Sequence, residues 1–210
     1  KTVIYFLFYI TFIFSFIFGE NSSGGSLNDS LIMQTYQDQI GDNLQNGIMF
    51  FIETKMVHSP VFYIIKTNLE NFLNKLSSDL IFLTLGFLIP IIFYSILKKQ
   101  FRGLDKNLLF GISLVLYFSP YLRSSAVWAT NDNLGLLFFV LSLSKFLTFT
   151  KKKNKSSKDI FLSFFYLILA TYIRQYYIII AFGYLVLLFR KIDIKIFFCL
   201  VIFNFFLLIP

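Results

Sequence analysis

The feature that most constrains this chain is a series of long apolar runs separated by short polar connectors. The first run, 3–18, contains no charged residue, and further runs of similar character follow from residue 80 onward. A helix needs about 20 predominantly apolar residues to cross the hydrocarbon core of a bilayer. Hydrophobic residues make up 57% of the chain and charged residues only 14%, which lies outside the usual range for soluble domains. The sequence therefore predicts an integral membrane protein.

The predicted fold class is all-α, a polytopic membrane protein with about seven transmembrane helices. The expected spans are 3–18, 80–97, 108–121, 134–149, 160–173, 177–189 and 196–209. The segment from Asp159 to Arg190 has no Gly or Pro turn in its middle, so the pattern of apolar residues alone does not show where one helix ends and the next begins. We place a bend at Arg174–Gln175, because one continuous helix would carry Arg190 to the side opposite the other basic loops.

Basic residues indicate the orientation. Lysines and arginines gather in 98–106, 145–158 and 190–195, and with Lys1 these clusters fall on one side, which the positive-inside rule assigns to the cytoplasm. The net charge of +8 follows from these loops. The lysine tract 151–158 has no interleaved aromatic residues, so no nucleic-acid partner is expected. The predicted location is the bacterial inner membrane or the membrane of the endoplasmic reticulum.

The polar segment 19–79 is expected to be an outer loop that contains surface helices. Apolar and polar residues are arranged for two such helices, at 29–40 and 60–76, and the second carries too many polar groups for a lipid-exposed span. The whole chain, 1–210, is interpreted as a single transmembrane domain. Because it begins with Lys1 and closes on an apolar run, we expect both ends to be cuts, with the carboxy-terminal part missing.

Few residues can carry chemistry. One histidine and one cysteine cannot make an ordinary zinc site, and the chain has no nucleotide-binding glycine loop. What remains is a set of ionisable residues that the predicted topology places together on the outer face: Asp29, Asp132, Arg123, Arg174 and His58.

The order of these residues resembles the front half of a GT-C glycosyltransferase, a multi-span enzyme that uses polyprenyl-phosphate or dolichyl-phosphate sugars. The protein mannosyltransferases and aminoarabinose transferases are of this kind. In that family an acid follows the first span, an amphipathic surface helix comes next, and a segment with Pro and Tyr opens the following element. The matching segments here are Asp29, then 31–40, then His58-Ser59-Pro60-Val61-Phe62-Tyr63, then the basic turn 98–102 before Ser119-Pro120…Arg123…Asp132, and later 170–175.

The chain also departs from the family pattern. The family's first acid is often followed by a second acid, whereas Asp29 is followed by Ser30, so Asp38 or Asp42 could be the true counterpart. Ser59 stands where proline is more common.

The resemblance implies transfer of a sugar, with inversion, from a lipid phosphate to an acceptor hydroxyl or amine on the outer or lumenal face. Asp29 is then the expected base. Arg174 is the first choice for holding the leaving phosphate and Arg123 the second. Asp132 would orient the acceptor or bind a metal, and His58 would hydrogen-bond the donor or the acceptor. No cofactor is assigned, metal dependence is left open, and the expected partners are the bilayer and the lipid-linked sugar.

Two other classes stay open at this point. A polytopic transporter or lipid flippase would also carry charges on the outer face, but it should show helices broken near the midplane, for which Gly86 with Pro90 is the only candidate. A non-catalytic membrane subunit would explain the apolar runs and the basic loops. It would not explain why the acids and the arginines are expected on the same face of the membrane. In that case Asp29 and Asp132 are solvated loop acids, and Arg174 extends to the outer headgroups.

Overall fold

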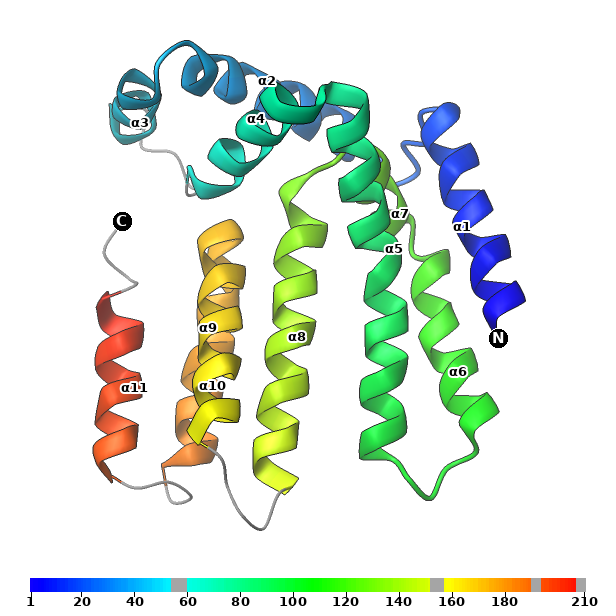
Figure 1. Ribbon diagram of the computed structural model, residues 1–210, viewed down its shortest axis with the longest axis vertical. Helices are drawn as coiled ribbons and strands as arrows, with labels where there is room; N and C mark the ends of the chain where they lie inside the picture. The colour runs from blue at the N-terminus through cyan, green and yellow to red at the C-terminus, as the bar shows by residue number, and fades with distance from the viewer. Residues whose placement is uncertain (54–59, 152–156, 190–193, 207–210) are drawn as a thin grey trace.

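A computed structural model describes residues 1–53, 60–151, 157–189 and 194–206, and every regular element in these ranges is helical. Figure 1 shows a row of roughly parallel helices, with three further helices lying across one end of the row. The parallel helices are α1 (Thr2–Ile17), α5 (Lys75–Gln100), α6 (Lys106–Leu114), α8 (Asn131–Lys151), α9 (Ser157–Ile173), α10 (Ile178–Leu188) and α11 (Ile194–Phe206). The crossing helices are α2 (Ser26–Asp42), α3 (Leu44–Glu53) and α4 (Val61–Leu73), which we call the cap.

The parallel helices occupy the apolar runs of the sequence. Two of them, α5 and α8, are long and apolar enough to cross a membrane. Three shorter apolar helices are Thr2–Ile17, Lys106–Phe118 and Gln175–Leu188. The all-helical class is therefore confirmed for the described residues, while a sevenfold crossing remains a prediction.

The cap corresponds to the predicted surface helices and adds one that was not anticipated. The expected helix at 29–40 is α2, and the expected helix at 60–76 is shorter, ending at Leu73. Asn74 stops it with a left-handed φ of 100° and then caps the next helix, because its side-chain oxygen accepts from the backbone N–H of Ser77. Helix α3 is the addition, and the four-residue spacing of Leu44, Ile48 and Ile52 is the signal from which it could have been predicted.

Two interruptions decide where functional side chains lie. The run after α6 tightens into a 3₁₀ turn, η1 (Val115–Phe118), and ends at Ser119, whose hydroxyl caps the short helix α7 (Pro120–Val127). The predicted bend at Arg174 is confirmed: α9 ends at Ile173, Arg174 has extended backbone (φ −140°, ψ 107°), and the 3₁₀ turn η2 (Gln175–Tyr177) leads into α10. Both interruptions are at the end of the row that carries the cap.

Basic side chains meet at the opposite end. Lys1 donates to the hydroxyl of Tyr94 at 2.7 Å and to the carbonyl of Lys106 at 3.3 Å. Lys151, at the end of α8, donates to the carbonyl of Gln100 at 2.7 Å. The amino terminus, the α5–α6 loop and the end of α8 therefore share one end of the row, as the charge pattern predicts (Figure 1).

The flanks of the row expose large apolar side chains. On α1 and α10 the exposed fractions reach 70% for Val3, 70% for Ile179 and 76% for Val186. Scattered exposed apolar residues are ordinary in soluble proteins, but runs of them along successive helices mark a surface that contacts something other than water. The exposed apolar side chains on these two helices are Val3, Ile4, Phe6, Leu7, Phe14, Ile17, Ile179, Phe182, Val186 and Leu187.

Candidate functional site under the cap

An ion pair joins the start of α8 to the bend after α9. Arg174 Nη2 lies 2.6 Å from Asp132 Oδ1, and both side chains are largely buried. Burial opposes the charge on Arg174, but the hydrogen bond and the negative charge of Asp132 outweigh it, so the pKa of the guanidinium is raised. The contact at the capped end therefore favours the charged form of Arg174.

Local packing brings Arg174 close to α8. Gly135 lies one turn after Asp132, and a Cβ placed on it would come within 3.4 Å of the Arg174 side chain and 3.1 Å of the Tyr177 ring. The absence of a side chain at this position lets the stem of Arg174 lie against the helix that carries its partner. The bend and this glycine together set the distance between the two charges.

Two tyrosines from other elements surround the pair. Burial raises the pKa of Tyr121, on α7, and the charge of Asp132 and a hydrogen bond to it raise it further. Burial also raises the pKa of Tyr63, on α4, to about 12. The charge of Arg174 lowers this pKa, whereas Tyr36 and Asp29 raise it. Both phenols are thus neutral near pH 7, and each can donate or accept a hydrogen bond next to the charged pair.

Asp29 lies in the first turn of α2 with its side chain exposed. Its charge acts on the hydroxyl of Tyr63, and so does the charge of Arg174. Helix α2 packs against both α4 and α7, while α4 also contacts α9. The fold therefore brings Asp29 and Arg174 to the same capped end of the row, although the sequence separates them widely.

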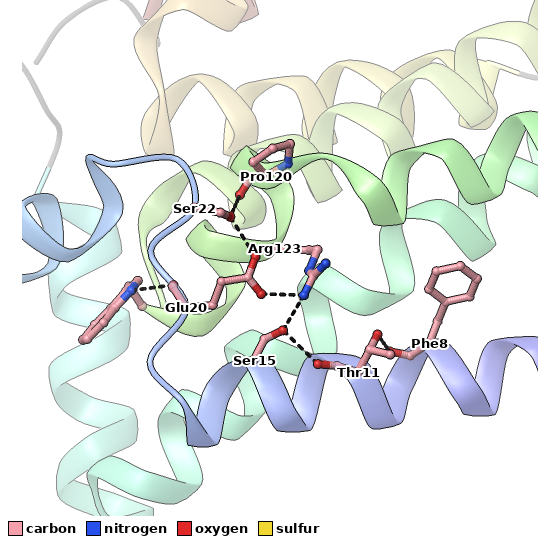
Figure 2. A network of polar contacts seen from close by, with 8 residues as sticks. Phe8, Thr11, Ser15, Glu20, Ser22, Pro120 and Arg123 are labelled. Atoms are coloured by element: carbon pink, nitrogen blue, oxygen red, sulfur yellow. Dashed lines mark hydrogen bonds and ion pairs between the residues drawn. The ribbon is translucent and has the colours of Figure 1, made fainter.

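Arg123 belongs to a different network, shown in Figure 2. Its Nη2 lies 2.5 Å from Glu20 Oε2 and donates to the hydroxyl of Ser15 at 2.7 Å. Burial alone would raise the pKa of the Glu20 carboxyl, but hydrogen bonds from Ser15 and Ser22 and the charge of Arg123 lower it below its usual range. Arg123 thus ties α7 to the end of α1, with Glu20 as its ion-pair partner. Its role as the second choice for holding the phosphate stays a prediction.

A third charged cluster, centred on Lys66, was not predicted from the sequence. This lysine is only 4% exposed, and its Nζ lies 3.5 Å from Asp79 Oδ1 and 3.8 Å from Glu70 Oε1. The same Nζ contacts the carbonyl of Ala129, in the turn before α8, at 3.5 Å. The polar spacing of 60–76 indicated an exposed face for this lysine, and only the fold reveals that the face is covered.

The remaining sequence candidates divide as follows. His58 lies outside the described residues, so its predicted role is not addressed. Asp38 is exposed on α2, and Asp42 is the last residue of that helix. In the part of the chain that the structure describes, no three His, Cys, Asp or Glu residues gather in a way that could hold a metal ion.

No family model matches the chain, and neither a curated protein nor a solved structure matches it. Function must therefore be inferred from the geometry and chemistry of the described residues.

Proposed function

We propose that this chain is a multi-pass membrane protein that transfers a sugar from a polyprenyl-phosphate or dolichyl-phosphate donor to an acceptor on the outer or lumenal face. The lipid environment is supported by the apolar flanks of the row and by the two helices long enough to span. The separation of the basic loops from the Asp132–Arg174 pair supports an orientation with the cap outside.

The observation that carries the proposal is the buried Asp132–Arg174 ion pair at the end of the row that is covered by the cap, whose helix α2 carries Asp29. A transferase that uses a lipid phosphate needs a base for the acceptor and a cation for the leaving group, on either side of the reacting carbon. The exposed carboxylate of Asp29 at the start of α2 and the largely buried guanidinium of Arg174 supply these two charges.

In the proposed reaction Asp29 takes the proton of the acceptor hydroxyl or amine as that group attacks the anomeric carbon. The new bond to the acceptor forms as the bond from the anomeric carbon to the phosphate oxygen breaks. The lipid phosphate leaves with the electron pair, and the configuration at the anomeric carbon inverts. Arg174 shares its guanidinium between Asp132 and the departing phosphate, so Asp132 serves to orient the cation.

A specific feature weighs against the transporter alternative. Many secondary transporters place discontinuous helices near the midplane of the membrane, where they bind substrate. Helix α5, which contains both Gly86 and Pro90, continues without interruption from Lys75 to Gln100. The candidate break is therefore an intact helix, which favours an enzyme with a fixed site over an alternating pathway.

The test compares two exposed acidic residues of the cap. Membranes containing the protein are supplied with a panel of polyprenyl-phosphate sugars, and release of the lipid phosphate is measured. Asp29→Asn should lower the rate by roughly a hundredfold or more, since that is a common contribution of a general base. Glu53→Gln, which removes an equally exposed acid from the cap helix α3, is the matched control and should retain the rate. Equal rates for the two variants would remove Asp29 from the mechanism.

A second arm addresses the cation. Arg174→Ala should weaken binding of the lipid-phosphate donor, measured by equilibrium binding to the purified protein, while Arg102→Ala at the opposite end should not. No transfer from any donor in the panel, together with unchanged donor binding in Arg174→Ala, would overturn the proposed function.

A further inference from the structure

The turn that precedes Asp132 has a strained backbone. Ala129, between α7 and α8, has a φ of +48°, in the left-handed region that a residue with a Cβ rarely adopts. Such a conformation is unfavourable for a residue with a Cβ and persists only where the surroundings hold it. Ala129 is also almost completely buried. Neighbouring groups must therefore fix this turn.

Hydrogen bonds link the turn to Asp132. The hydroxyls of Ser125 and Thr130 contact each other, and the backbone N–H of Thr130 donates to the carbonyl of Ser125 at 3.0 Å. The Thr130 hydroxyl in turn donates to Asp132 Oδ2 at 3.4 Å. A shift of the turn would consequently move the hydroxyl that holds one oxygen of Asp132, while Arg174 holds the other.

Lys66 is the group outside the turn that reaches its backbone. Its Nζ contacts the Ala129 carbonyl at 3.5 Å and lies between Asp79 on α5 and Glu70 on α4. Glu70 also accepts from the amide of Gln37 on α2, at 3.4 Å. A buried ammonium with two acidic partners is therefore linked to two helices of the cap, to α5 and to the strained turn.

We propose that Lys66 is a positioning residue, which holds the α7–α8 turn in its left-handed conformation and thereby sets Asp132 against Arg174. Lys66 itself does not touch a reacting atom. Through its contacts with α4 and α5, it makes the geometry of the ion pair depend on the seating of the cap. The contribution to transfer rests on the proposed function, whereas the effect on the turn does not.

The chain supplies its own probe of the turn. Trp128 is the only tryptophan, it directly precedes Ala129, and its indole N–H donates to the carbonyl of Glu20 at 2.9 Å. Its fluorescence and its accessibility to a soluble quencher report on the turn without any knowledge of the substrate. The purified protein in detergent micelles is sufficient for this measurement.

Lys66→Met removes the ammonium and keeps a long side chain. We expect a shift of the Trp128 emission and a quenching constant for acrylamide that rises roughly twofold, because the freed turn opens locally. Lys75→Met is the matched control, since it removes the same charge from an exposed position on α5. Helical circular dichroism verifies that each variant is folded. Emission and quenching identical to those of the control would overturn the proposal.

Loss of the ammonium leaves Asp79 and Glu70 facing each other, so Lys66→Met could fail to fold. Lys66→Arg then decides, because it keeps the charge but replaces a compact ammonium with a planar fork. We expect Trp128 quenching above that of Lys75→Arg, and an equal value would overturn the proposal.

A kinetic arm separates positioning from general stability. In folded protein at saturating donor, Lys66→Met should lower kcat with little change in KM, and Lys66→Arg should restore part of kcat. A rise in KM with kcat unchanged would contradict the positioning role. If no variant and no wild-type sample transfers sugar, the proposed function fails, and the fluorescence result still decides the role of Lys66 at the turn.

Discussion

Arg174 Nη2 lies 2.6 Å from Asp132 Oδ1, and this contact joins the start of α8 to the residue that follows the end of α9. The acid is in the first turn of α8, where the helix N-terminus favours negative charge, and the arginine occupies the single extended residue between α9 and η2. The bend after α9 turns Arg174 toward α8. Gly135 has no side chain and therefore leaves room for the aliphatic part of Arg174. The pair is the charged centre under the cap.

A double-mutant cycle measures the strength of this pair. Asp132→Asn and Arg174→Gln should each lower the free energy of unfolding by about 3–5 kcal/mol, because each leaves a buried charge without its partner. The double variant should lose less than the sum of the two, with a coupling energy of about 1–3 kcal/mol. Chemical denaturation in micelles, followed by circular dichroism, gives all four values.

Arg102→Gln provides the control for that cycle, since Arg102 is exposed in the α5–α6 loop and should change stability by less than about 0.5 kcal/mol. Additive losses in the cycle would show that the contact between Asp132 and Arg174 contributes no net stability.

Close packing of α5 against the start of α8 leads to a second prediction. A Cβ on Gly86 would lie 2.7 Å from Asn133 Nδ2 and 2.9 Å from the Cβ of Ala126. The amide of Asn133 donates to the Leu122 carbonyl at 2.8 Å and therefore cannot move without losing that bond. Gly86→Ala should reduce the free energy of unfolding by about 1–3 kcal/mol.

The matched control for this substitution is Gly111→Ala on α6, where no atom lies within 4 Å of the added Cβ. Alanine should stabilise that helix by up to about 1 kcal/mol. Thermal unfolding of both variants gives the comparison, and a gain in stability for Gly86→Ala would contradict the close packing of α5 on α8.

The Glu20–Arg123 contact predicts a dependence of stability on acid. The pKa of Glu20 in the folded state is lowered below its ordinary value of 4.5. Its contribution to stability is therefore complete above the unfolded-state pKa and is lost as the pH falls through the lower, folded-state pKa. Glu20→Gln should reduce the slope of stability against pH in this acidic window, as measured by denaturation at a series of pH values.

Glu53→Gln, which removes an exposed acid at the end of α3, is the control for Glu20→Gln and should leave the slope nearly unchanged. If the free energy of unfolding falls equally with acid in Glu20→Gln and in the unaltered protein, Glu20 is excluded as a source of the pH dependence.

Features that depend on local pattern were predictable from the sequence. Apolar runs located the long helices, and the conflict between helix length and the placement of Arg190 located the bend at Arg174. The charge pattern also placed Lys1, the α5–α6 loop and Lys151 at one end, as the contacts of Lys1 and Lys151 show. Each of these inferences needs only composition, period and the sign of charge along the chain.

Partnerships between charges could not be predicted in the same way. Arg123 and Arg174 look alike in sequence, since each lies in a polar turn between apolar runs. Which acid each arginine meets depends on how α7 packs on α1 and how α9 packs on α8, and these are long-range contacts. Lys66 was missed for a related reason, because an amphipathic helix of the cap can bury its polar face when acids from two helices meet it.

Sidedness of the cap is the last prediction, and it tests the membrane topology directly. Cys199→Ser removes the only thiol, after which single cysteines are introduced at positions that an impermeant thiol reagent can reach. Gln175→Cys, in the exposed turn after Arg174, and Ser30→Cys, beside Asp29, represent the capped end. Gly103→Cys, where no atom lies within 4 Å of an added Cβ, represents the basic end.

In sealed, right-side-out vesicles Gln175→Cys and Ser30→Cys should be labelled, and Gly103→Cys should react only after the membrane is permeabilised. The basic loops are expected in the cytoplasm, because translocating their lysines is unfavourable. Labelling of Ser30→Cys and Gln175→Cys from opposite sides would separate Asp29 from Arg174 by the bilayer, and a transferase site shared between them would then be impossible.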